Sequence, residues 1–263
     1  MGRHEVLTSP ANALLKEVRR AVSHGGLTDD GYMVAETFHL LEEAMRAGLE
    51  IQTVLFAESV KATVRDRLPQ AGIRVAAVAD SLFQKMAATE SSQGVITLAR
   101  PPTWNLEDCL RPPSLVIVLD GLQDPGNAGA IVRAAEAFGA TGVLFTKGTV
   151  SPFNPKTLRA SAGSLFRVPF LHNLDVEQAR AALLQRGFAV YAAMPSKAEA
   201  PSAVDLTRNC ALVIGSEARG VSEQMRSGAI GLSIPTVGVE SLNAAVAAGI
   251  LLYEAQRQRL SRP

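Results

Sequence analysis

The sequence has little cysteine and no long apolar run. Cys109 and Cys210 are its two cysteines in 263 residues, and neither belongs to a CxxC or Cys/His cluster. This excludes a disulfide framework and a cysteine-based structural zinc site, and it favours a reducing, cytoplasmic location. No stretch reaches the roughly 18 apolar residues of a membrane span, and no apolar segment follows the basic N-terminus. We therefore expect a soluble protein that is neither exported nor bound to a membrane.

Two common nucleotide-binding motifs are also absent. The segment 126–129 gives only GxxG rather than GxGxxG, and GxxxxGK[ST] does not occur. A dinucleotide-dependent oxidoreductase is disfavoured for this reason. The net charge of +1 is no argument for a nucleic-acid partner by itself. The basic residues Lys147, Lys156, Arg159 and Arg167 lie within one short region, which is either ordinary solvated surface or an anion-binding patch.

Two Pro-Pro pairs divide the chain. They bracket residues 101–113, and because proline pairs continue neither a helix nor a central strand, this stretch is the predicted linker between an N-terminal domain (1–100) and a second domain (114–263). In the first domain the hydrophobic pattern predicts helices at 12–22, 34–47 and 60–68, and strands at 51–56, 74–78 and 95–98.

Strands and helices alternate throughout the second domain. The predicted strands are 115–119, 142–145, 189–193, 211–214 and 231–234, and the predicted helices are 130–138, 176–185 and 242–259. Such alternation implies a parallel sheet covered on both faces. The last helix is apolar on every side, so we expect its own sheet to cover one side and a second subunit the other.

Three segments of the second domain end an apolar run in a turn rich in glycine, proline and asparagine. They are residues 119–133, 213–220 and 234–249. Turns of this kind place backbone N–H groups and a few polar side chains where a small ligand can bind. The form alone does not specify the ligand.

Four polar residues in these segments allow a structural or a functional interpretation. Arg133 has small and apolar neighbours, so we expect a buried guanidinium that needs an anionic or polar partner. Asn127 is either a helix N-cap or a site residue. Glu217 either caps a helix that begins near Val221 or belongs to the site. Ser241 is a natural N-cap for the last helix.

Taken together, in this order and at this spacing, the three segments resemble the motifs of the SpoU/TrmH branch of the SPOUT RNA methyltransferases. The resemblance is carried by Asn127, Arg133, Gly215, Glu217, Pro235, Ser241, Leu242 and Asn243. Residues 153–166 also resemble the family's stretch between the first and second motifs. The N-terminal half is similar to the family's small RNA-binding domain of ribosomal-protein-L30e type, in its Ser9-Pro-x-Asn12 opening and its strand at 93–95.

This resemblance implies an α/β fold: a parallel sheet whose C-terminal loops form a deep trefoil knot, preceded by a small α/β domain of L30e type. It also implies S-adenosyl-L-methionine as cofactor, a homodimer with the active site at its interface, and no metal. The expected cofactor-binding residues are Ala193, Met194, Gly215, Ile234, Pro235 and Leu242. The expected catalytic residues are Arg133, Asn127, Glu217, Ser241 and Asn243, and the expected RNA contacts are Arg159 and Lys156.

The function implied is methylation of a ribose 2′-hydroxyl in structured RNA, with 23S ribosomal RNA favoured because a separate N-terminal domain is present. Two alternatives stay open at this point. One is a transfer-RNA 2′-O-methyltransferase, and the other is a nonenzymatic RNA-binding or assembly protein that has kept the fold. Since a pure binding protein need not retain Arg133, Glu217 and Asn243 together, the enzyme is preferred.

Overall fold

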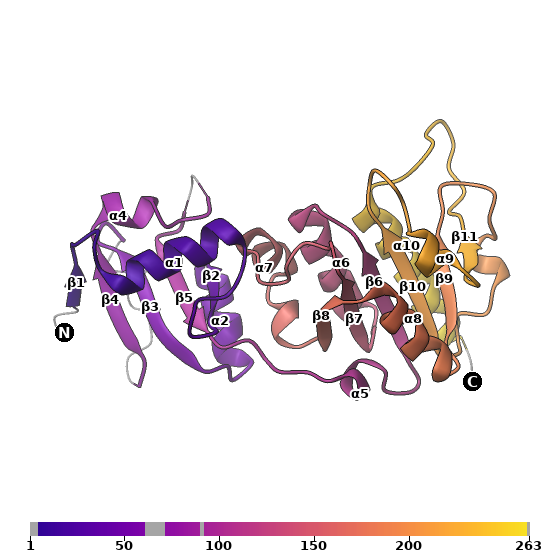
Figure 1. Cartoon of the computed structure of the whole chain (residues 1–263), viewed down its shortest axis with the longest axis horizontal. Coiled ribbons are helices and arrows are strands. Elements are labelled where there is room, and N and C mark those ends of the chain that lie inside the picture. The colour runs from indigo at the N-terminus through magenta and orange to yellow at the C-terminus, as the bar shows by residue number, and fades with distance from the viewer. Residues whose placement is uncertain (1–4, 61–71, 90–91, 262–263) are drawn as a thin grey trace. The chain divides into compact units, whose positions relative to one another are not determined.

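The computed structural model describes residues 5–60, 72–89 and 92–261 (Figure 1). Contacts divide the chain into two compact units. Unit 1 comprises Met1–Thr103 and Ser151–Arg167, and unit 2 comprises Trp104–Val150 and Val168–Pro263. The chain therefore leaves unit 2 at residue 151 and returns to it at residue 168.

Unit 1 contains a mixed sheet with the strand order β1-β4-β3-β5-β2. β1, β4 and β3 are parallel to one another, whereas β5 runs antiparallel to both β3 and β2. The strands are β1 (Glu5–Leu7), β2 (Met33–Glu36), β3 (Ile51–Ala57), β4 (Arg74–Val78) and β5 (Val95–Ala99). The helices are α1 (Ala13–His24), α2 (Phe38–Arg46), α4 (Asp80–Gln84) and α7 (Pro155–Ser161).

Helices cover both faces of this sheet. Leu15 of α1 and Phe83 of α4 belong to one buried cluster, so these two helices share a face. Phe38 and Leu41 of α2 belong to a second cluster on the opposite face. Complete burial of each such side chain stabilises the fold by about 1.5–3 kcal/mol.

The predicted helix at 34–47 is wrong in its first part. Residues Met33–Glu36 form β2, which pairs with β5, and the helix begins only at Phe38. Thr37 marks the boundary, because its side chain accepts a hydrogen bond from the backbone N–H of Leu40 and so caps α2. The predicted helix at 60–68 falls almost entirely outside the described residues.

Two ion pairs attach the segment Ser151–Arg167 within unit 1. Nη1 of Arg159 lies 3.2 Å from Oε2 of Glu36, whose side chain is 2% exposed. Arg167 pairs with Glu43 on α2. Burial would raise the pKa of Glu43, but hydrogen bonds and charge from Arg167 and Arg46 lower it overall.

Unit 2 confirms the predicted parallel sheet. Its six strands are all parallel, in the order β11-β9-β10-β6-β7-β8. They are β6 (Leu115–Asp120), β7 (Gly142–Thr146), β8 (Phe170–Leu174), β9 (Ala189–Ala193), β10 (Cys210–Gly215) and β11 (Ile230–Leu232). The helices are α5 (Leu106–Cys109), α6 (Pro125–Ala137), α8 (Val176–Gln185), α9 (Glu223–Arg226) and α10 (Ala244–Leu260).

Helices cover this sheet on both faces as well. Side chains of α5, α8 and α9 share a buried cluster with Val116, Val118 and Val213, while α6 and α10 pack together and α10 contacts β10. The edge strand β8 is missing from the sequence-based prediction. Its sequence contains His172 and Asn173, both exposed, and these two polar residues interrupt the apolar pattern. Asn173 also adopts a positive φ of 57°, which is uncommon in a strand.

Arg259 fixes the C-terminal end of α10. Its Nη2 donates hydrogen bonds to the carbonyl oxygens of Ser114 (2.8 Å) and Arg208 (2.7 Å). Its Nε donates to Leu206 (3.0 Å) and its Nη1 to Pro113 (3.3 Å). One guanidinium therefore joins the last helix to the chain that leads into β6 and the chain that leads into β10.

Replacing Arg259 tests this anchor. We expect Arg259→Ala to lower the free energy of unfolding by about 2–4 kcal/mol, because several carbonyl groups lose a charged donor together. Urea denaturation followed by circular dichroism measures the change. The matched control is Arg257→Ala, since the exposed Arg257 pairs with Glu254 three residues away on the same helix and its loss should change stability little. Equal loss in both variants would contradict the role of Arg259.

Candidate functional site

The carboxyl ends of four neighbouring parallel strands lie at one edge of the unit 2 sheet. β10 pairs with β6 so that Gly215 lies opposite Asp120. β11 pairs with β9 so that Leu232 lies opposite Ala193, and β9 pairs in turn with β10. The turns that follow these strands therefore meet at the same edge, which in open α/β sheets is where ligands bind.

The first of these turns leads into α6. Asp124 is the N-cap of this helix, since its Oδ1 accepts a hydrogen bond of 2.7 Å from the backbone N–H of Asn127. Pro125 follows at the first helical position, where its missing N–H has no cost. The interpretation of Asn127 as the N-cap is thus wrong, and its side chain is available for other contacts.

Asn127 joins the three segments through its side-chain amide. Its Nδ2 donates a hydrogen bond of 2.7 Å to Oε1 of Glu217. Its Oδ1 accepts a hydrogen bond of 3.0 Å from Nδ2 of Asn243. Glu217 and Asn243 lie 90 and 116 positions after Asn127 in the sequence, and the three side chains form one polar chain. Glu217 does not cap a helix, because Ser222 is the N-cap of α9.

The start of α10 differs from the sequence-based expectation. Asn243, not Ser241, is the N-cap, and its Oδ1 accepts hydrogen bonds from the backbone N–H groups of Ala245 (2.9 Å) and Val246 (3.2 Å). The amide of Asn243 thus has two roles: its oxygen caps the helix and its nitrogen contacts Asn127. Ser241 lies exposed two residues earlier.

Arg133 is exposed, which corrects the expectation of a buried guanidinium. The apolar residues that flank it in sequence, Ile131 and Val132, point into the core, whereas Arg133 shares the outer face of α6 with Ala130 and Ala137. Among the described residues, no hydrogen bond or ion pair to its guanidinium is found. The group is therefore free to bind an anion supplied from outside unit 2.

Asp120 supports this edge and was not singled out from the sequence. It is only 4% exposed. Its Oδ1 accepts a hydrogen bond of 3.1 Å from the Thr146 hydroxyl, and its Oδ2 accepts one of 2.7 Å from the backbone N–H of Ser222. The carboxylate thereby ties the end of β6 to the residue that follows the Glu217 turn. A lone acidic residue at the end of an apolar strand was the available signal.

The residues expected to bind the cofactor lie at the ends of these strands or in the turns that follow them. Gly215 has no room for a side chain, because a Cβ there would lie 2.0 Å from the backbone carbon of Gly220. Ala193 ends β9, and the N–H of Met194 donates to the carbonyl of Leu232 at 2.8 Å. Ile234, Pro235 and Leu242 belong to the stretch between β11 and α10.

These residues fit a nucleoside ligand in chemical character. Met194, Ile234 and Leu242 present partly buried apolar side chains beside turn backbone, and adenosine needs apolar contact together with a few backbone hydrogen bonds. Lys156 and Arg159, the expected RNA contacts, belong to unit 1 and are not part of this polar chain.

Neither a metal site nor a membrane span is found in the described part of the chain. No group of three or more His, Cys, Asp or Glu side chains there is arranged to hold a metal ion. No helix there has the length and apolar character required to cross a membrane.

Family models match both parts of the chain. The SpoU rRNA Methylase family model matches residues 114–253, more than half of the sequence and all of the edge described above. The chain belongs to the SpoU rRNA methylase family. A second model, the MRM3-like substrate binding domain, matches residues 15–97.

Relatives and solved structures agree with this family. An uncharacterised tRNA/rRNA methyltransferase of Synechocystis is 33% identical, with 96% of this chain and 94% of the relative covered. The 23S rRNA (guanosine(2553)-2′-O)-methyltransferase RlmP of Bacillus subtilis is 29% identical, with 94% and 97% covered. The crystal structure of an AdoMet-bound rRNA methyltransferase from Sinorhizobium meliloti matches with a TM-score of 0.80 at 26% identity, covering 99% of this chain and 100% of that one.

The substitution Asn127→Asp tests the polar chain of this SpoU-family protein. The new carboxylate faces Glu217, where the native amide donates a hydrogen bond. We expect methyl transfer to fall about 100-fold at pH 8. When two carboxylates lie side by side, the pKa of one of them is raised. Once that carboxyl is protonated, it can donate a hydrogen bond as the native amide does. Activity relative to the native protein should therefore recover as the pH is lowered.

The matched control is Asn105→Asp. Oδ1 of Asn105 caps α5 by accepting a hydrogen bond from the backbone N–H of Asp108, and an aspartate oxygen at residue 105 can accept the same hydrogen bond. Methyl transfer should stay near the native rate. An Asn127→Asp protein with unchanged activity at pH 8 would remove Asn127 from the site.

Proposed function

We propose that this protein transfers a methyl group from S-adenosyl-L-methionine to a ribose 2′-hydroxyl of structured RNA, with 23S ribosomal RNA as the favoured substrate and the cytoplasm as its location. The observation that carries the proposal is the hydrogen-bonded chain Glu217–Asn127–Asn243 at the edge where the strands end. The activity named for RlmP and the bound AdoMet named for the Sinorhizobium structure support the reaction class and the cofactor.

The reaction needs a better nucleophile than a neutral ribose hydroxyl. S-adenosyl-L-methionine supplies an electrophilic methyl group on a sulfonium. The protein must stabilise the oxygen of the 2′-hydroxyl as its proton passes to solvent water. A guanidinium stays protonated and is a poor base, so Arg133 acts as an electrostatic stabiliser of this oxygen and as a phosphate contact.

The polar chain orients the ribose. Glu217 uses one lone pair of Oε1 to accept from Asn127, and its other oxygen can accept from a ribose hydroxyl. Asn243 holds Asn127 from the opposite side and is itself fixed by capping α10. Ser241 adds a hydroxyl in the turn before that cap.

The cofactor is proposed to bind against the turns that hold Ala193, Met194, Gly215, Ile234, Pro235 and Leu242. We also propose that the segments between β10 and α10 form a trefoil knot. No residue of this chain is assigned to a metal.

We assign residues 1–100 to binding substrate RNA through a domain of L30e type, residues 101–113 to a linker, and residues 114–263 to methyl transfer. The match of residues 15–97 to a substrate binding domain supports the first assignment. Lys156 and Arg159 are kept as RNA contacts, because a guanidinium has five N–H donors and Arg159 uses one for Glu36.

A homodimer is part of the proposal. Four exposed apolar side chains lie four, three and seven residues apart along α10: Val246, Ile250, Tyr253 and Leu260, which are 51%, 39%, 55% and 77% exposed. They form one apolar stripe on a helix whose opposite side packs on its sheet, as the sequence suggested for a helix covered by a second subunit. A second copy of the chain is the proposed partner.

Replacing Arg133 tests the reaction. Arg133→Ala should lower kcat/KM for RNA methylation about 100- to 1000-fold, while the Kd for S-adenosylhomocysteine stays within about twofold. Arg208→Ala, which removes an arginine that pairs with Asp205 on the surface, serves as the control and should leave both quantities unchanged. Native turnover in Arg133→Ala would exclude Arg133 from the mechanism.

Replacing Ile250 tests the dimer. We expect sedimentation velocity to find a dimer of the native protein at micromolar concentration and a monomer of Ile250→Asp, because a charge in an apolar interface is costly. Leu184→Asp is the matched control, since Leu184 on α8 is 44% exposed and should tolerate the charge. A native protein that sediments only as a monomer would refute the proposed interface.

A further inference from the structure

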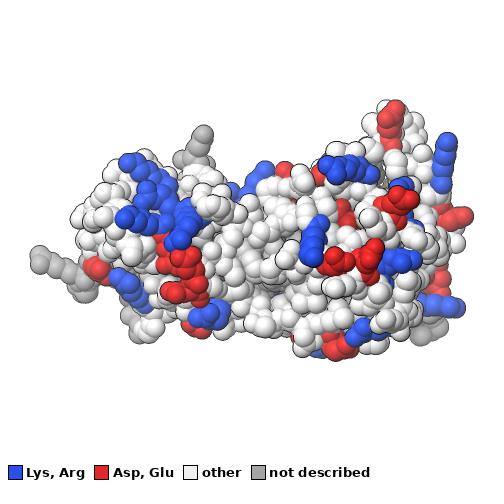
Figure 2. Space-filling view, in the orientation of Figure 1, with Lys and Arg blue, Asp and Glu red and all other residues white. Residues whose placement is uncertain are grey.

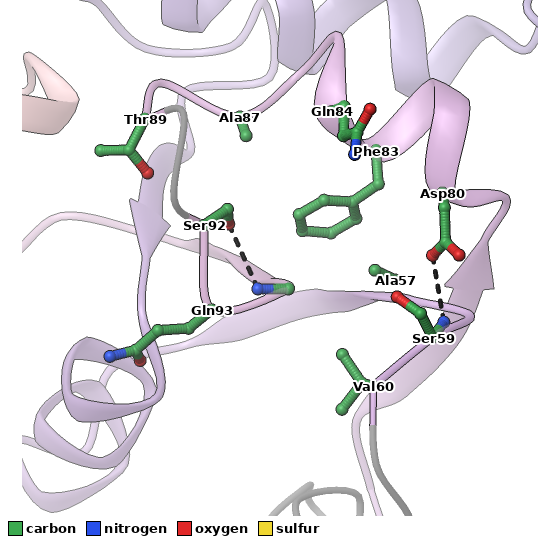
Figure 3. A pocket seen from close by; sticks show the side chains of 11 residues that line it. Ala57, Ser59, Val60, Asp80, Phe83, Gln84, Ala87, Thr89, Ser92 and Gln93 are labelled. Atoms are coloured by element: carbon green, nitrogen blue, oxygen red, sulfur yellow. Dashed lines mark hydrogen bonds between the residues drawn. The ribbon is translucent and has the colours of Figure 1, made fainter.

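Unit 1 contains a cavity of about 640 Å³ that no motif explains (Figure 3). Its walls are the end of β3 with the turn that follows, helix α4, and the loop that precedes β5. We infer that this cavity binds an unpaired nucleobase of the substrate RNA. The inference rests on the proposed function and deepens it, since it assigns the recognition of RNA to a particular site.

The size and charge of the cavity favour a base over a phosphate. Small-molecule sites have volumes of about 300–1000 Å³, so the space suits a nucleotide-sized group. No lysine or arginine is among the described residues that line it. This described lining, which includes the carboxylate of Asp80, does not compensate a phosphate, whereas a base is neutral.

An aromatic ring and small apolar groups form one part of the wall. The ring of Phe83 points into the cavity in Figure 3, near Ala57 and Val60. Phe83 is 2% exposed and belongs to the buried cluster of α1 and α4, so it forms part of the apolar floor of the cavity rather than a free stacking surface. An unpaired RNA base can contact such a floor, and apolar and aromatic contact with a base is worth about 1–3 kcal/mol.

Polar atoms at the wall can read the edge of a base. Oδ1 of Asp80 accepts a hydrogen bond of 3.0 Å from the backbone N–H of Ser59, and its other oxygen can accept from a ligand. The Ser92 hydroxyl oxygen accepts from the N–H of Gly94 at 3.2 Å, which leaves its O–H able to donate. One acceptor and one donor match a base that has an amino group beside a ring nitrogen, such as cytosine.

Basic side chains on the same unit can hold the backbone of that RNA. Figure 2 shows Lys and Arg side chains gathered over α1, which carries Lys16, Arg19 and Arg20. α1 and α4 lie on the same face of the sheet, and the exposed Lys85 directly follows α4. Unit 1 thus combines a cavity whose described lining has no positive charge with basic side chains on the same face of the sheet, an arrangement typical of single-stranded RNA binding.

Filling the cavity tests the inference without touching the Phe83 core. Ala87 lines the cavity and is half-buried, so Ala87→Phe places a ring in the space. Ser81→Phe adds the same ring at an exposed position of α4 that does not line the cavity. The probe is a fluorescent pool of random single-stranded RNA of about 20 nucleotides, titrated into the full-length protein by anisotropy.

We expect Ala87→Phe to raise the Kd about tenfold or more, because the new ring occupies the space of one bound base, and Ser81→Phe to leave it within about twofold. The KM for ribosomal RNA should rise with the Kd, while kcat stays unchanged. Equal RNA affinities of the two variants would overturn the inference. Binding of an apolar peptide in the cavity, without any change in RNA affinity, would overturn it as well. If RNA binding responds as expected but no methyl group is transferred, the proposed function fails and the binding site stands.

Asp80→Asn provides a second test, which remains available if Ala87→Phe does not fold. An asparagine keeps the oxygen that accepts from Ser59 and replaces the free oxygen with a donor. The native preference for oligo(C) over oligo(U) should then fall or reverse, because uracil presents an acceptor where cytosine presents its amino group. A base preference that is the same in both proteins would overturn the assignment of Asp80.

Discussion

Parallel pairing of β6 with β10 is the constraint on which the site depends. The register places Asp120 opposite Gly215, so the two turns begin side by side. Because both strands are buried, a shift of register would turn their apolar side chains to the wrong face. The buried carboxylate of Asp120 stabilises this arrangement by accepting hydrogen bonds from the Thr146 hydroxyl and the backbone N–H of Ser222. The contact between Asn127 and Glu217, only 2.7 Å long, follows from that geometry.

The last helix completes the arrangement because both of its ends are held. At its start, Asn243 caps α10 and contacts Asn127. At its end, Arg259 donates to carbonyl groups next to β6 and β10. The outer side of the helix carries an apolar stripe that faces solvent in the single chain. The same element therefore links the core of the sheet, the polar chain and the proposed dimer contact.

Much of unit 2 could be predicted from the sequence, because buried parallel strands are continuous apolar runs and their turns are marked by glycine and proline. The contacts of Asp120 and Arg259 could not, since they join residues about 25 to 145 positions apart that no local pattern connects. Residues 34–36 were misassigned because a short strand buried on both faces resembles the start of an apolar helix. Arg133 was misjudged because small neighbours in sequence do not decide which face of a helix is covered.

The edge that holds Asn127, Glu217 and Arg133 is proposed to transfer a methyl group to a ribose oxygen. The most direct measurement incubates the protein with methyl-tritiated S-adenosyl-L-methionine and bacterial ribosomal or transfer RNA that lacks the modification, and then hydrolyses the RNA with alkali. A 2′-O-methyl group removes the hydroxyl that alkaline cleavage requires. We expect label in ribosomal RNA, retained in alkali-resistant dinucleotides. Label in alkali-labile mononucleotides, as base methylation would give, or no label in either RNA would contradict it.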